Sequence, residues 1–592
     1  MIKSAGLSSL VWSVIAVVLL VVGAIGGYFA GITSTQPVTQ TEIRTSTITA
    51  GAVTVTQPTT ITSIITSTVI QPTTVTKTLT ETVKPTESPP VSKGKYGGTL
   101  TMAVADQGYG NLDVAYAPSV QFTSAAIMAL YEPLVVMDLE GKIKPNLATS
   151  WERVDDITWI LNLRKGVKFH DGTPFNASAV VFTIERSLSK DKPSWASATV
   201  LQGKVSKVEA IDDYTVKFTL TSPFVEFLEA LAGFRGFDSP SAVKKLGDEA
   251  YGTNPVGTGP FKFVKWVYNQ YLELEAYNDY WQGRPYLDKL IIKIIPEASV
   301  RLLELEKGTI DLILISPEDA ARIASNQKLQ LVQGPSTKWH ILSINLQANV
   351  THPALLDKRV RQAINYAINR TELIQALEYG YATPAITMIL PFWKDYWDPT
   401  LKVYPDNGDP VKAKQLLSEA GYPNGFETEI LGSPYLKFDQ TALIIQNQLA
   451  KVGIKAKVST PEFAVFAQTV ITSKPWQLAV HDVNIPYRQR FYDFYHSGPG
   501  IGIFNLQHVN DPVLDKLLEQ AVAEKDLAKS KELYTQIGKR ILDEAYGAPL
   551  YYPTIIYATQ SYVKGFYAHP HPWYGTVISL KSVGIDTYLD KT

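Results

Sequence analysis

The chain has 592 residues, which is long enough for more than one packed core. Its 55 basic and 56 acidic residues leave a net charge of −1, so the sequence lacks the positive field that nucleic-acid binding needs. The absence of cysteine excludes disulfides, thiolate metal sites, cysteine nucleophiles and lipid attachment through an N-terminal cysteine.

The first predicted element is a transmembrane anchor over residues 10–32. This segment is almost entirely apolar, and no charged residue occurs between Lys3 and Glu42. At 1.5 Å per residue, a helix of this length spans a hydrocarbon core of about 30 Å. A cleaved secretory signal is the alternative, but its apolar region is usually about 7–15 residues. We therefore expect a retained single-pass helix, with residues 1–9 as a cytoplasmic N-terminus or short leader and the binding domain extracellular at the cell membrane.

Residues 33–95 are expected to form a stalk. Ser and Thr make up 26 of the 59 residues from 33 to 91, Pro is scattered and aromatic residues are missing. Such a segment cannot bury a core of its own. The Thr/Val alternation could form a strand, but without an obvious partner sheet an extended, O-glycosylated segment is the favoured interpretation.

From Tyr96 to the C-terminus the composition is that of a globular body. Period-two alternation predicts strands, including a pair in 205–220 joined by a turn at Asp212–Asp213. Helical spacing predicts helices, one of them followed by a stop at Gly453 and a further strand. The pattern indicates an α/β or α+β fold with several sheets. Strands are predicted within 97–105, 158–169 and 205–220, a helix within 359–377, a helix and strand within 441–460, and two helices within 511–542.

Several motifs carry a family resemblance. The stretch "PNLATSWERVDDITWILNLRKGVKFHDGTPFNASAVVFTIER", residues 145–186, resembles the signature of solute-binding proteins of dipeptide/oligopeptide-type ABC importers, peptide-binding family 5. Segments such as "NPVGTGPFKFVKW", "AKQLLSEAGY" and "LYTQIGKRILDEAYGAPLYYP" match in the same order, so the resemblance covers residues 96–592. The anchor and the Ser/Thr-rich stalk suit an archaeal member of that family.

The resemblance implies a two-lobed α/β fold like that of periplasmic binding proteins (class II, cluster C), with an extra subdomain. Lobe I would comprise about 96–112, 235–310 and 549–592, the extra subdomain about 113–234, and lobe III about 311–548. Closure of the lobes would trap a ligand and present both lobes to a membrane permease. We also expect a monomer without catalysis, cofactor or metal.

Peptide-binding members hold the ligand's N-terminal ammonium with a buried Asp. In this chain Asp482 falls on that position, with Asn484 in register and His481 before it, although Ala479–Val480 replace the expected Trp. A desolvated ammonium needs a carboxylate partner, which an Asp supplies. The alternative for Asp482 is a structural turn or a salt bridge that closes the lobes.

Two further groups are candidate ligand contacts. Trp393, Tyr396 and Trp397 lie together in a Pro-bounded loop and could stack on sugar faces or peptide side chains, or simply pack against the lobe. Arg488 could hold a carboxylate in a bidentate contact, or be solvated.

The sequence therefore favours a membrane-tethered receptor that captures peptides for ABC transporter permease subunits. An oligosaccharide ligand is the alternative within the family. An extracellular hydrolase is the alternative from another class, but it needs an acid/base pair that the sequence does not locate, and the chain has no HExxH or G-x-S-x-G motif.

Overall fold

The computed structural model describes residues 45–50, 53–58, 94–106, 110–117, 120–189, 201–471, 475–484, 488, 490–498, 504–568 and 586–591. The predicted anchor, residues 10–32, and most of the predicted stalk lie outside these ranges. Within them, no helix combines the length and the apolar character that crossing a membrane requires. Within the stalk, β1 (Thr45–Ala50) and β2 (Val53–Pro58) pair antiparallel, with Thr45 opposite Pro58. The Thr/Val alternation noted in the sequence therefore forms strands here, and each strand is the partner of the other.

The body, Gly94–Thr592, is one compact unit, and the first of its sheets centres on β3 (Thr99–Val104). This strand is parallel to β12 (Lys289–Ile294) on one side and to β13 (Leu312–Leu314) on the other. Alternation along β3 places Leu100 and Met102 in the core beneath α2 (Gln121–Leu130). β10 (Phe261–Val267) and β11 (Tyr271–Ala276) extend the sheet beyond β12.

A second set of strands is built around β15 (Lys338–Ile344), which is buried along its whole length. β15 pairs antiparallel with β19 (Leu478–Asn484), and β17 (Glu427–Leu431) runs parallel to β19 and to β18 (Lys455–Ser459). Helices α11 (Lys358–Ala367), α12 (Arg370–Leu377), α13 (Pro410–Glu419) and α14 (Phe438–Ala450) lie on these strands or on one another.

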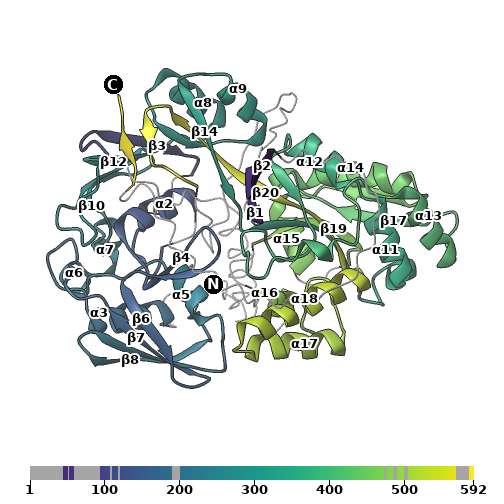
Figure 1. Ribbon diagram of the computed structural model, residues 1–592, viewed down its shortest axis with the longest axis horizontal. Helices are drawn as coiled ribbons and strands as arrows, with labels where there is room; N and C mark the ends of the chain where they lie inside the picture. The colour runs from purple at the N-terminus through teal and green to yellow at the C-terminus, as the bar shows by residue number, and fades with distance from the viewer. Residues whose placement is uncertain are drawn as a thin grey trace, which may run out of the picture. The chain divides into compact units, whose positions relative to one another are not determined.

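The long strand β20 (Gly547–Gln560) joins the two sets of strands into one sheet. Its first half pairs with β15, and its second half pairs with β13 and with β14 (Leu329–Pro335). The chain crosses back between β14 and β15, so two neighbouring segments, 335–338 and 553–554, connect the halves. We call residues 94–335 and 554–591 the N-terminal lobe and residues 336–553 the C-terminal lobe; the sequence placed the corresponding divisions near 310 and 548. Figure 1 shows β20, in yellow, running between the two groups of elements.

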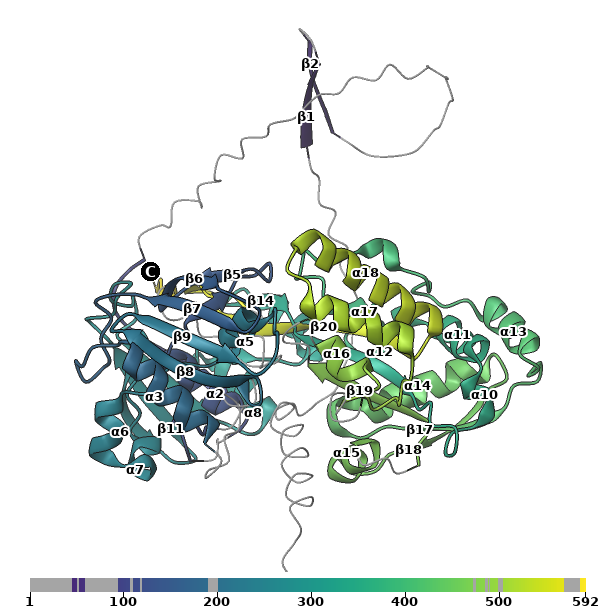
Figure 2. The ribbon, with the colours of Figure 1, turned by 90° about the horizontal axis from the view of Figure 1, so that it is seen from below.

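The N-terminal lobe carries an additional antiparallel sheet in the order β6 (Ala148–Arg153), β7 (Thr158–Leu163), β9 (Thr215–Leu220), β8 (Val205–Asp212). The turn at Asp212–Asp213 joins β8 to β9, as the sequence predicted. Helix α3 (Ala177–Leu188) covers this sheet, and Figure 2 shows the helix beside β8. The motif residue His170 bonds to the carbonyl of Gly259 at 2.9 Å, so the family motif fastens this sheet to the rest of the lobe.

The remaining described elements are short or peripheral. They are β4 (Val135–Met137), β5 (Ile143–Pro145), α5 (Phe227–Gly233), α6 (Pro240–Leu246), α7 (Asp248–Thr253), α8 (Ala298–Lys307), α9 (Ala320–Ala324), α10 (Pro353–Leu356), β16 (Ala382–Pro384), α15 (Phe463–Ile471), α16 (Arg490–Tyr495), α17 (Pro512–Ala523), α18 (Leu527–Glu544), β21 (Val563–Lys564), β22 (Tyr588–Leu589), and the 3₁₀ turns Pro317–Asp319, Pro399–Leu401 and Tyr435–Lys437.

Candidate functional site

Strands β15 and β19 present ionisable side chains where the C-terminal lobe meets the connecting segments. Opposite residues in an antiparallel pair point to the same face, and His340 lies opposite Asp482 while Lys338 lies opposite Asn484. These four side chains therefore share one face. The intervening Trp339 points to the other face, where it joins the largest apolar cluster.

Lys338 and Asp482 form a buried ion pair. The ammonium lies 2.8 Å from the carboxylate, and each side chain is 3% exposed. Burial is the largest effect on Asp482 and raises its pKa, but the contact with Lys338 and the neighbouring His340 and His481 together outweigh burial, and the pKa ends below its ordinary value. The carboxylate that the sequence assigned to a ligand's ammonium is therefore already in contact with an ammonium of the chain itself.

His340 is enclosed beside this pair. Its ring stacks on Tyr551 with centroids 4.5 Å apart and meets Phe438 edge-on. Burial lowers the pKa of His340 to about 4, so the ring is neutral at pH 7. Its Nδ1 atom is buried without a hydrogen-bond partner among the described residues. Such an atom is costly unless a ligand or water meets it.

A cavity of about 90 Å³ opens at this point, directly on the two connecting segments. Residues of both lobes line it, so a molecule held there contacts both. Its walls are mostly apolar, with a few polar groups, which is the usual composition of a small-molecule site. The apolar lining comprises Leu314, Pro317, Leu436, Pro553, Ile555 and Ile556, and the polar lining Ser336, Lys338, His340, Glu378, Lys437 and Thr554.

Glu378 and Lys437 also line the cavity. The Lys437 ammonium lies 3.1 Å from the carboxylate of Glu318, which comes from the N-terminal lobe. The hydroxyl of Tyr551 lies close to the carboxyl group of Glu378, and this contact lowers the pKa of Glu378 and raises that of Tyr551. Removal from water raises the pKa of Glu378 to about 7, against a smaller opposing effect of the Lys437 charge.

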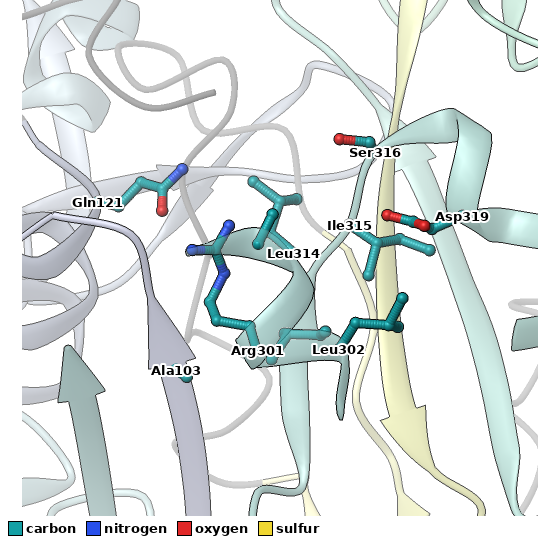
Figure 3. Close-up of a pocket in the computed structure, with 10 residues that line it drawn as sticks. Ala103, Gln121, Arg301, Leu302, Leu314, Ile315, Ser316 and Asp319 are labelled. Atoms are coloured by element: carbon teal, nitrogen blue, oxygen red, sulfur yellow. The ribbon is translucent and has the colours of Figure 1, made fainter. Parts of the chain in front are cut away.

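A second, smaller pocket lies in the N-terminal lobe and shares Leu314 with the first. Figure 3 shows Arg301 and Gln121 on one side of Leu314, and Ser316 and Asp319 on the other. Arg301 donates to the carbonyls of Ile295 and Pro296, at 2.7 Å each. This second pocket has a volume of about 20 Å³, which is room for about one water molecule. The cavity of about 90 Å³ on the two connecting segments, which we call the hinge cavity, is therefore the stronger candidate for a ligand.

The other predicted residues of β19 have separate surroundings. His481 points to the opposite face from Asp482, and its Nε2 lies 2.8 Å from the hydroxyl of Ser343. Asn484 ends the strand beside Lys338. The structure thus brings Asp482 and Asn484 to the cavity side of the sheet and turns His481 away from it.

The predicted aromatic residues and Arg488 meet between the lobes rather than at the cavity. Trp393 is 2% exposed and Tyr396 is 7% exposed, and both belong to an apolar cluster with members from both lobes. Trp397 meets Tyr552 edge-on. Arg488 lies over the ring of Tyr396 at 3.8 Å.

Arg488 also pairs with two carboxylates of the N-terminal lobe. Its guanidinium lies 3.1 Å from Glu226 and 3.0 Å from Glu229. Burial alone would lower its pKa, but these carboxylates hold the pKa above its ordinary value. The group predicted to meet a ligand's carboxylate therefore meets carboxylates of the opposite lobe.

No sequence pattern pointed to the cavity residues Lys338, His340, Glu378 and Lys437. They come from segments up to about a hundred residues apart, and only β15 pairing and the ends of α12 and α14 place them at one cavity. A lysine two residues before a histidine in a strand is otherwise an ordinary pattern.

Comparison with known proteins agrees with this architecture. Residues 142–501 match the family described as bacterial extracellular solute-binding proteins, family 5 (middle). The chain belongs to this family. It is therefore a substrate-binding protein of the ABC-transporter type, and its relatives are solute-binding proteins rather than enzymes.

Three matches illustrate the relationship. The glutathione-binding protein GsiB of Shigella dysenteriae is 32% identical over 506 residues, covering 80% of this chain and 95% of the relative. The structure of HbpA2 from Haemophilus parasuis gives a TM-score of 0.74 at 26% identity, covering 83% of this chain and 100% of the other. The structure of DppA from Helicobacter pylori in complex with the peptide STSA gives a TM-score of 0.65 at 27% identity. This match covers 84% of this chain and 99% of the other. These relatives are bacterial, and the archaeal source suggested by the sequence is not borne out.

Proposed function

We propose that this family member captures peptides outside the cell and delivers them to the permease of an ABC importer, held at the membrane as a monomer by the segment 10–32. The observation that carries the proposal is the position of the hinge cavity on both connecting segments. A ligand there touches both lobes, so its binding energy can favour their closed arrangement.

The chemistry of the cavity suits a peptide better than a sugar. Its polar groups are ionisable, as a peptide's charged ends require, and its walls can take apolar side chains. The Trp and Tyr residues that could have stacked on a sugar are packed between the lobes. The relatives also favour a peptide ligand: GsiB is named for binding glutathione, a tripeptide-like thiol, and DppA was solved with a tetrapeptide.

Thermal unfolding of the full chain in detergent tests this function. The probes are a random tetrapeptide mixture with free N-termini, glutathione, and a mixture of gluco-oligosaccharides. A peptide that binds the folded state should stabilise it by about 2.7 kcal/mol at 100 times its Kd. Stabilisation by the oligosaccharides alone would contradict the peptide proposal. Mass spectrometry of the recovered ligand should show it unchanged, since hydrolysis would indicate an enzyme.

A further inference from the structure

One carboxyl group and two lysines line the hinge cavity, and two further carboxylates lie next to it as partners of the lysines. The cations that line it are Lys338 and Lys437, and each is paired with a carboxylate, Asp482 and Glu318 respectively. Glu378 also lines the cavity, but among the described residues it forms no ion pair. His340 is neutral and does not alter this count. Glu378 is thus a cavity carboxyl group without a partner cation among the described residues, and its pKa of about 7 leaves it about half ionised at pH 7, so that a ligand cation beside it would favour the ionised form.

Asp482 is not available for that charge. The ammonium of Lys338 is attached to the same sheet, 2.8 Å from the carboxylate, and both side chains are almost completely buried. A ligand ammonium would have to displace Lys338 and leave its charge unpaired in the protein interior, which is strongly unfavourable. Lys338 lines the cavity, and Asp482 is the acceptor behind it.

Glu378 has the surroundings of a cation-binding group. It follows the last residue of α12, where the helix carbonyls give a partial negative charge that favours a cation. The Tyr551 hydroxyl lies beside its carboxyl group and favours the ionised form. A carboxylate accepts several hydrogen bonds, so an ammonium can bind beside the tyrosine.

A second, independent feature marks the same cavity as a ligand site. His340 lines it, is 5% exposed, and has an Nδ1 atom without a hydrogen-bond partner among the described residues. Lys338 carries three N–H donors and forms an ion pair with Asp482. A ligand with amide groups next to its cationic end can bond to both, which the N-terminus of a peptide provides.

We propose that Glu378, and not Asp482, binds the ammonium group of the ligand, and that the protein therefore selects peptides with a free N-terminus. This inference rests on the proposed peptide-binding function. It names a specificity-determining residue at the end of α12 that the family motif does not identify.

The test uses the full chain in detergent and measures the concentration of probe that gives half-maximal thermal stabilisation. The probes are the random tetrapeptide mixture with free N-termini and the same mixture after N-acetylation. For the wild-type protein, the half-maximal concentration of the free mixture should be about 10- to 100-fold lower than that of the acetylated mixture. This is the effect expected for one charged hydrogen bond.

Glu378→Gln should lose that preference and require about 10- to 100-fold more of the free mixture, because it keeps the size of the side chain but removes its charge. Glu378→Asp keeps the charge and should retain the preference with weaker binding. Glu427→Gln changes an exposed carboxylate of the same lobe and should behave as wild type. Far-UV circular dichroism checks that each variant is folded.

The remaining outcomes separate the two proposals. If the wild type prefers free N-termini and Glu378→Gln does so equally, the role of Glu378 is overturned while peptide binding stands. Equal binding of both mixtures by the wild type overturns the ammonium site. If neither mixture binds, the proposed function itself fails.

Discussion

At the scale of single residues, His340 makes stability depend on pH. Its pKa is about 4 in the folded protein because the ring is buried, against an ordinary value of 6.5. The charge of Asp482 opposes this lowering, and the charges of Lys338 and His481 reinforce it. Between pH 6.5 and 4 the unfolded chain therefore binds a proton that the folded chain does not.

The free energy of unfolding should consequently fall as the pH is lowered through that window, by up to about 3 kcal/mol from His340. His340→Phe keeps an aromatic ring against Tyr551 and cannot be protonated. In urea unfolding, the free energy of unfolding of the variant should fall less than that of the wild type between pH 7 and pH 4.5. Equal losses in the two proteins would contradict a buried, neutral His340.

At the scale of elements, the segment 359–377 shows both the strength and the limit of sequence periodicity. Its apolar spacing predicted helix, and the structure has helix, but as α11 and α12 with a break at Ile368–Asn369. The break follows from capping, because the Asn369 side chain accepts a hydrogen bond from the backbone of Glu372 at 2.9 Å. The restart at Asn369 also fixes where α12 ends, and hence the position of Glu378.

Asn369→Ala should therefore destabilise the protein by about 1 kcal/mol, the usual cost of losing an Asn cap. Chemical denaturation gives the value directly. Asn349→Ala is the matched control, since Asn349 belongs to the same lobe but is exposed in a turn. A similar loss for both variants would show that the cap at α12 contributes nothing.

Other elements followed from the sequence for local reasons. The β8–β9 hairpin and the α14–Gly453–β18 unit match their predicted order, and Gly453 has a φ of +95°, which favours glycine. The hinge cavity could not be predicted in this way. Ion pairing of Lys338 with Asp482 depends on the register of two strands about 140 residues apart, and periodicity within either strand carries no information about that register.

At the scale of the whole body, Arg488 holds the two lobes together. Its guanidinium joins Glu226 and Glu229 of the N-terminal lobe and lies over Tyr396 of the C-terminal lobe. Nearby, Lys394 of the C-terminal lobe pairs with Glu140 of the N-terminal lobe, but that pair is exposed and contributes little. The buried Arg488 contacts are thus the main polar connection across this part of the interface among the described residues.

Arg488→Met should weaken ligand binding by a different route from Glu378→Gln. Removal of the guanidinium leaves two carboxylates facing an apolar cluster, a change that costs about 3–5 kcal/mol for a fully buried pair. That cost falls on the closed arrangement, since opening lets water reach Glu226 and Glu229. The affinity for every peptide should fall together, while the preference for free over acetylated N-termini stays at its wild-type value, because the hinge cavity is unchanged.

Small-angle X-ray scattering with a saturating peptide mixture should show a larger radius of gyration for Arg488→Met than for wild type. Arg490→Met is the control, because Arg490 lies two residues away and pairs with Asp493 of its own helix at 3.1 Å. An altered preference for N-termini in Arg488→Met would mean that interface and cavity are not separable. An unchanged affinity and radius would mean that the apolar cluster alone keeps the lobes closed.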